Sequence, residues 1–139
     1  MPATEPARSG ANVEHLEPSD WQKTRSFSPA IITEGGRTVW LAGQTTLTDL
    51  EGKDISGHFE LQARTIFELI NRTLQRAGGT LANLVTMTVF INDPRNGEKF
   101  VHMRQEYFPE GRYPCSALVT VSNFARAGCV IEIQSVAVI

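Results

Sequence analysis

The C-terminal segment constrains the fold of this 139-residue chain most strongly. Between Cys129 and Val138 apolar residues occupy both sets of alternating positions, with Val130, Val136 and Val138 in one set and Ile131, Ile133 and Ala137 in the other. Successive side chains of a strand point to opposite faces, so a strand that is apolar on both faces needs a cover on both. The segment therefore predicts a strand that is covered on both faces of its sheet.

The remaining patterns predict an α+β domain. From Phe59 to Ala77 the apolar residues recur with the i, i+3, i+4 spacing of one helical face, and two glycines follow. A second helix is predicted around Phe100, Met103, Tyr107 and Phe108. Strands are expected at 38–43, 85–91, 117–122 and 129–138, with 30–33 as the antiparallel hairpin partner of 38–43.

Two helices are too few to cover both faces of such a sheet, so we expect them side by side on one face. The other face then keeps apolar residues that this chain has no further element to cover. Self-association is the economical way to bury them, and the pattern predicts a homo-oligomer.

Composition narrows the class of protein. Residues 1–20 have no hydrophobic period and predict a disordered or extended tail, leaving 21–139 as one domain. The net charge of −2 comes without a basic stripe, which argues against nucleic acid as a partner. Short apolar runs, and a start lacking an apolar stretch after basic residues, predict a cytoplasmic protein without a membrane segment. The two cysteines are then expected to be reduced.

Glu132 is the most conspicuous candidate for chemistry, because it is a carboxylate within an apolar strand. One interpretation places it in solvent on an amphipathic face beside Gln134. The other places it in a partly buried site, where a raised carboxyl pKa would suit a general acid or base. The sequence favours neither interpretation over the other.

Other polar candidates are weaker. Cys115 and Ser116 lie at a loop-to-strand junction, where side chains often face a cleft, but no histidine has a telling spacing from Cys115. Arg104 and Arg112 could bind an anion through their planar guanidinium groups, although most surface arginines only solvate a fold. The histidines and cysteines form no ligand pair, so neither a metal nor a cofactor is expected.

Several segments, taken together in chain order, resemble one family. They are Ser26-Phe27-Ser28-Pro29-Ala30, Leu41-Ala42-Gly43-Gln44, the Gly-Gly-Thr-Leu-Ala-Asn-Leu-Val run of 78–85 that leads to Thr88-Val89-Phe90-Ile91, Tyr107-Phe108-Pro109, Tyr113-Pro114, and Val130-Ile131-Glu132-Ile133 with Ala137-Val138. Over residues 25–139 the chain resembles the RidA/YjgF family. The resemblance implies a chorismate mutase-like (YjgF-like) fold and a homotrimer with a central barrel and ligand clefts between subunits. Typical members hydrolyse small enamines and imines, such as 2-aminoacrylate, without metal or cofactor.

The resemblance also implies site residues and departures from the usual site. Glu132 matches the acidic residue thought to position the attacking water, while Ser116 stands where active members have an arginine that clamps the substrate carboxylate. Other registers place Cys115 or Ala117 there, and none of the three is a cation. Phe27 replaces a frequent tyrosine, and Ala42, before Gly43, replaces a frequent serine.

These features lead to two functional hypotheses. The first is a Rid-type hydrolase or deaminase that acts on a small reactive imine, enamine or related metabolite of lower negative charge. In it Glu132 positions water, Gly43 offers backbone amides, and Phe27, Ala42, Arg112, Cys115 and Ser116 bind substrate. The second is a non-catalytic trimer that binds a metabolite or a protein partner in the same clefts. A third possibility, a reactive thiol at Cys115, would require an activated thiolate.

Overall fold

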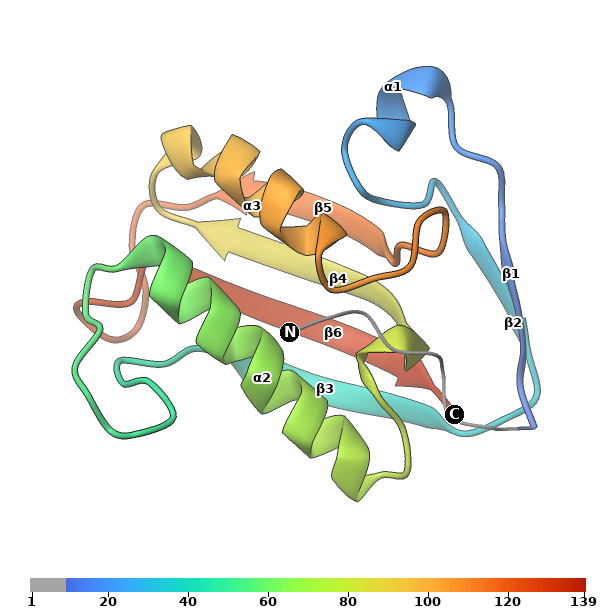
Figure 1. The fold of residues 1–139 in the computed structure, drawn as a ribbon, viewed down its shortest axis with the longest axis horizontal. Helices are drawn as coiled ribbons and strands as arrows, with labels where there is room; N and C mark the ends of the chain where they lie inside the picture. Colours follow the sequence, from blue (N-terminus) through green and yellow to red (C-terminus); the bar gives the residue numbers. More distant parts are fainter. Residues whose placement is uncertain (1–9) are drawn as a thin grey trace.

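A computed structural model describes residues 10–139, and its main feature is a four-stranded mixed sheet (Figure 1). The strand order is β3-β6-β4-β5, formed by Thr38–Gln44, Ile131–Val138, Leu84–Ile91 and Cys115–Thr120. Strand β6 runs antiparallel to both of its neighbours, whereas β4 and β5 run parallel. The C-terminal segment is therefore an inner strand of this sheet.

Both long helices cover the same face of this sheet. In Figure 1, α2 (Phe59–Arg76) crosses β3 and β6, and α3 (Gly97–Gln105) lies over β4 and β5. Short 3-10 turns precede β4 at Leu81–Asn83 and α3 at Pro94–Asn96. The predicted α+β architecture, with two helices on one face of a mixed sheet, is confirmed.

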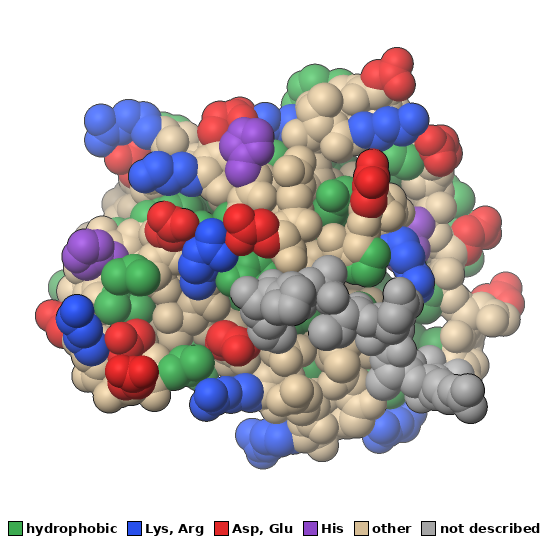
Figure 2. All heavy atoms as spheres, in the orientation of Figure 1, with side chains coloured by type: hydrophobic (Ala, Val, Ile, Leu, Met, Phe, Trp, Pro, Cys, Tyr) green, Lys and Arg blue, Asp and Glu red, His purple; other side chains and the backbone are tan. Residues whose placement is uncertain are grey.

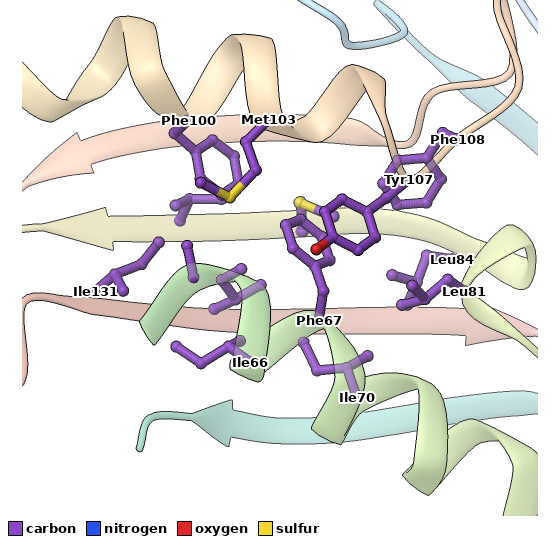
Figure 3. Packing of buried hydrophobic residues seen from close by; sticks show 14 of the residues in the cluster. Ile66, Phe67, Ile70, Leu81, Leu84, Phe100, Met103, Tyr107, Phe108 and Ile131 are labelled. Atoms are coloured by element: carbon purple, nitrogen blue, oxygen red, sulfur yellow. The ribbon is translucent and has the colours of Figure 1, made fainter. Parts of the chain in front are cut away.

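The core lies between the helices and the sheet (Figure 3). Phe67 of α2 is fully buried, and its ring stacks on Tyr107 with 4.3 Å between the ring centroids. Phe100 and Phe108 complete the aromatic cluster around Phe67, with centroids at 6.0 and 6.3 Å. This cluster joins α2 to α3 and to the loop that follows α3.

The N-terminal residues form a second, small sheet. Strand β1 (Asn12–His15) pairs antiparallel with β2 (Ile31–Glu34), and between them the short helix α1 (Asp20–Lys23) begins at a capping box in which Ser19 and Gln22 satisfy each other's backbone amides. Part of the expected tail of residues 1–20 thus forms a strand and the N-cap and first residue of a helix, and its residues 1–9 lie outside the described part of the chain.

The expected hairpin of 30–33 with 38–43 is wrong. Strand β2 pairs with β1, and β3 pairs with β6, so the two segments belong to different sheets. Gly35 and Gly36 both adopt positive φ, and the chain then enters the large sheet at Arg37, whose backbone exchanges two hydrogen bonds with Ile139. Strand β3 therefore pairs with the C-terminal strand β6, although the local glycine turn predicts that it pairs with β2.

The sheet face away from the helices carries exposed apolar side chains. Trp40 on β3 is 79% exposed, and Val119 on β5 is 40% exposed. The register pairs Trp40 with Val136 and Val119 with Phe90, so these side chains share the uncovered face. The feature that predicts self-association is thus present in the fold.

The helix-bearing face has a mixed charge pattern. Figure 2 shows acidic and basic side chains intermingled over α2 and α3. Arg64 of α2, for example, contacts Glu60 at 3.2 Å and Glu106 at 2.6 Å, which links α2 to the end of α3. Such exposed pairs contribute little to stability individually. Within residues 10–139, no helix is long and apolar enough to cross a bilayer.

Ser135 on β6 supplies a test of the core. Its side-chain oxygen is buried without a hydrogen-bond partner among the described residues. Removing an unsatisfied buried hydroxyl releases a desolvation penalty, so Ser135→Ala is expected to raise the free energy of unfolding by up to about 1 kcal/mol. Urea denaturation measures the change. The matched control is Ser28→Ala, which removes a buried hydroxyl that donates to the Tyr113 carbonyl and should destabilise the fold. Equal losses in both variants would contradict the prediction.

Candidate functional site

Glu132 lies beside an irregularity in the sheet. The β3–β6 register shifts between Leu41 and Gln44, so Ala42 and Gly43 have no paired residue on β6. A Cβ atom built on Gly43 would lie 2.9 Å from Glu132 Oε2, which means that the carboxylate occupies the space a side chain would need. Bulges of this kind re-aim backbone groups and are frequent next to active sites. Glu132 and the Ala42–Gly43 bulge therefore form one unit.

The surroundings of Glu132 are partly apolar. Its side chain is half-buried on the uncovered face, opposite Phe90 of β4 in the register. Gln134, the next residue on this face, is exposed. The Glu132 carboxylate is thus in partial contact with solvent and lies beside the backbone of Gly43, an environment between the two that the sequence leaves open.

Cys115 lies on the same face as Glu132 but at a distance from it. Cys115 pairs with Thr86, whereas Glu132 pairs with Phe90, four residues further along β4. At about 3.3 Å per residue, this separates the two by roughly 13 Å along the strands. Within one protomer Cys115 is therefore not part of the Glu132 unit.

Burial of the Cys115 side chain raises the pKa of its thiol above the ordinary value. The thiolate is the reactive form, so Cys115 should be alkylated by iodoacetamide at pH 7.5 more slowly than a model thiol. Mass spectrometry of a Cys129→Ser variant, in which Cys115 is the only cysteine of the chain, measures this rate. A rate above that of free cysteine would revive the reactive-thiol hypothesis.

A second group of candidates gathers on the opposite face of the sheet. Ser116 pairs with the buried Met87, and its side chain points towards α3. Phe27 and Ser116 line one cavity of about 330 Å³, whose other walls are Trp21, Arg25, Val101, Arg104 and Leu118. The structure therefore brings two of the expected binding residues together, but on the other side of the sheet from Glu132.

Arg104 is the unexpected member of this cavity. Its side chain is only 2% exposed, and its guanidinium donates to Ser116 Oγ at 2.5 Å, Ser26 Oγ at 3.2 Å and the Arg25 carbonyl at 3.1 Å. Burial, together with the nearby charge of Arg25, lowers the pKa of Arg104 to about 10, which still leaves it charged at neutral pH. The hydroxyl of Ser116 thus contacts a cation supplied by a helix.

Arg112, by contrast, is exposed on the loop before β5. Burial, and after it the charge of Arg112, lowers the pKa of His15, so Arg112 lies on the β1 side of the molecule. Gly111 and Tyr113, its neighbours, line a larger cavity of about 520 Å³ that also includes His15 and Phe27. The structure does not bring Arg112 to Glu132 or to Ser116.

Arg104 is the residue that sequence reasoning undervalued, and a signal for it exists. It lies four residues after Phe100 and three before Tyr107, two positions that define the apolar face of the second helix. Helical spacing thus places Arg104 on the buried side. An arginine on that side needs partners inside the fold, whereas a surface arginine does not.

The described residues contain no group of three or more His, Cys, Asp or Glu side chains that could hold a metal ion. The Glu132 unit instead offers a carboxylate beside a backbone bulge, and the Arg104 cavity offers a guanidinium beside aromatic side chains. The first suits handling of water and protons, and the second suits recognition of an anion.

Comparison with known proteins identifies the family. Residues 18–139 match the family model described as endoribonuclease L-PSP. A RutC-family protein of Pyrococcus horikoshii is 30% identical over 111 residues, covering 80% of this chain and 85% of that protein. RidA from the Antarctic bacterium Psychrobacter sp. is 30% identical, with a TM-score of 0.67 over 81% of this chain and 87% of that chain.

Structures of lower sequence identity share this fold. A conserved Rid-family protein of unknown function from Yersinia pestis, YyfB, has a TM-score of 0.75 at 20% identity, covering 93% of this chain and 98% of that chain. This likeness confirms the YjgF-like fold, and the match of the family model over most of the chain confirms the resemblance to the Rid proteins. With its mixed sheet, its two helices on one face and these relatives, the chain belongs to the RidA/YjgF family.

Proposed function

We propose that this protein is a Rid-type hydrolase or deaminase that acts on a small reactive imine, enamine or related metabolite, in the cytoplasm and without a metal or cofactor. The observation that carries the proposal is the Glu132 unit. There a half-buried carboxylate contacts Gly43 at a bulge, where two consecutive backbone units lack register partners on β6. A carboxylate that positions water beside backbone amides is what hydrolysis of a polarised C=N bond needs.

The proposed reaction uses Glu132 first as base and then as acid. The carboxylate takes a proton from water as the water oxygen bonds to the imine carbon, and the C=N electron pair moves to nitrogen, which takes a proton from solvent. Glu132 then returns its proton to the amine nitrogen. The C–N bond breaks and ammonia leaves as the hydroxyl group gives its proton back to solvent and becomes the carbonyl. Water is consumed and no oxidant or reductant is required.

The complete site requires more than one protomer in this proposal. The Ala42–Gly43 bulge lies on β3, and Ser116 lies on β5, and these are the two edge strands of the sheet. If the β3 edge of one copy lies against the β5 edge of the next, the Ala42–Gly43 bulge of one copy comes beside strand β5 of its neighbour. Repetition of this head-to-tail contact closes a ring, and a homotrimer with a barrel of inward-facing sheets would also cover Trp40.

The experiment is release of ammonia from imines that an amino-acid oxidase generates in the assay. The proposal expects release faster than in buffer, with a series of apolar and polar amino acids as imine sources. Rates equal to buffer for the whole series, with protein shown to be folded, would remove this chemistry.

A second candidate function is binding without turnover, by a homotrimer that takes a metabolite or a protein partner. The observation in its favour is that the Arg104 cavity is formed within one protomer, away from Glu132. A ligand that raises the melting temperature but is recovered unchanged would favour this function, because binding to the native state alone stabilises it.

A further inference from the structure

We infer that Arg104, reaching from α3, is the ligand-binding cation of this protein, and that the cavity it shares with Trp21, Phe27 and Ser116 takes a small monocarboxylate with an apolar substituent. The inference rests on the proposed function only in one respect, namely that the bound carboxylate is also the substrate. It replaces the expectation of a substrate of lower negative charge, which followed from the neutral residue at position 116.

The first argument is the charge balance around Arg104. No carboxylate among the described residues lies within ion-pair distance of its guanidinium, whereas the neighbouring Arg25 is paired with Glu98 at 2.6 Å. Within the described chain its charge is compensated by the Phe100 ring, 5.1 Å from the guanidinium carbon, by three hydrogen-bond acceptors and by Tyr113. Buried charges in proteins are usually paired or bind a ligand, so an anion is the missing partner.

The second argument is the number of hydrogen-bond donors. A guanidinium has five N–H groups, and Arg104 uses one on Nε, one on Nη1 and one on Nη2. One N–H is left on each terminal nitrogen. Two parallel N–H donors are what a carboxylate takes from an arginine in a bidentate pair. Because these three hydrogen bonds hold the guanidinium, its plane is fixed before a ligand arrives.

The third argument is the shape and lining of the cavity. Its volume of about 330 Å³ admits a small molecule, and its other walls include the rings of Trp21 and Phe27 and the side chain of Leu118. The two rings meet edge to face at 6.2 Å between centroids, which makes an apolar corner. The cavity therefore has one cationic wall and one apolar wall, which favours an amphipathic anion over a phosphate or an inorganic ion.

The test measures equilibrium binding and needs no turnover. Phenylacetate is the probe and phenylacetamide its neutral isostere, and Trp21 fluorescence in a Trp40→Phe background reports occupancy, because the chain has two tryptophans. The wild-type site is expected to bind phenylacetate at least ~10-fold more tightly than the amide, the preference that one charge-assisted pair provides. Equal affinities, or no binding of the acid, would overturn the inference.

Variants test whether Arg104 causes the preference for phenylacetate over phenylacetamide. Arg104→Gln should bind acid and amide equally, while Arg95→Gln removes an exposed, Asp93-paired arginine and should keep the preference. Because a buried variant can fail to fold, Ser116→Asp is the second test. It leaves Arg104 in place and provides the missing carboxylate internally, so phenylacetate binding should fall by at least ~10-fold while amide binding changes little. Unchanged acid binding in Ser116→Asp would overturn the inference.

The binding and ammonia-release experiments can contradict the Arg104 inference and the proposed hydrolase function independently. Charge-selective binding with no ammonia release would leave Arg104 as the anion site of a binding protein. Ammonia release without preference for the acid would leave the hydrolase and remove Arg104 as its binding cation.

Discussion

Replacing Glu132 with glutamine is expected to lower the rate of ammonia release by roughly 10²- to 10⁴-fold, the contribution that a positioned general acid–base group makes. Glutamine keeps the size of the side chain and its contact with Gly43, but it does not take a proton from water. The loss should therefore appear in the turnover rate, with the melting temperature close to that of the wild type. Ammonia release from oxidase-generated imines, measured at saturating and limiting substrate, checks both parts.

The matched control is Glu34→Gln, which removes an exposed carboxylate at the end of β2 and should leave the rate unchanged. Gly43→Ala gives an independent check, because its Cβ would lie 2.9 Å from Glu132 Oε2 and displace the carboxylate while keeping its charge. The role of Glu132 would be lost if the glutamine variant retained wild-type turnover.

Phe67→Ala is expected to lower the free energy of unfolding by about 3–5 kcal/mol, because it empties the centre of the aromatic cluster. Phe67 is fully buried and stacks on Tyr107 at 4.3 Å, so its removal leaves a cavity that neighbouring rings have little freedom to fill. A loss of this size is a large fraction of the stability of a typical domain. Chemical denaturation followed by circular dichroism measures it.

Leu61→Ala is the control on the same helix, since Leu61 is 48% exposed. It should cost less than about 1 kcal/mol, because little buried area is lost. Similar losses in both variants would mean that the cluster around Phe67 does not determine the stability of the fold.

The layers of the fold were accessible to prediction because they depend on local periodicity. The i, i+3, i+4 spacing from Phe59 onward corresponds to α2, which ends at Arg76, and the alternation of 85–91 corresponds to β4. The pairing partner of β2 could not be predicted from local periodicity. The Gly35–Gly36 turn is compatible with a hairpin, but the backbone pairing of Arg37 with Ile139, 102 residues later in sequence, takes β3 into another sheet.

The candidate site also contains residues that the sequence indicates and a residue that only the tertiary structure shows. Glu132 and Gly43 could be named from residue type and from the family resemblance, and the fold places them in contact. Arg104 was visible in the sequence only as one arginine among several. Its role depends on contacts with Ser26 and Arg25, 78 and 79 residues away, and on the absence of a carboxylate partner within the described chain.

By itself, the sequence determined the apolar faces, and these determined the two helices on one side of the sheet and the uncovered side opposite. Hydrophobic periodicity contains this information because each element shows locally which of its sides avoids water. The tertiary structure alone decided which side chains share a cavity. It placed Ser116 against Arg104 and separated both from Glu132 by the thickness of the sheet, because side chains alternate between faces and only the strand register fixes which ones meet.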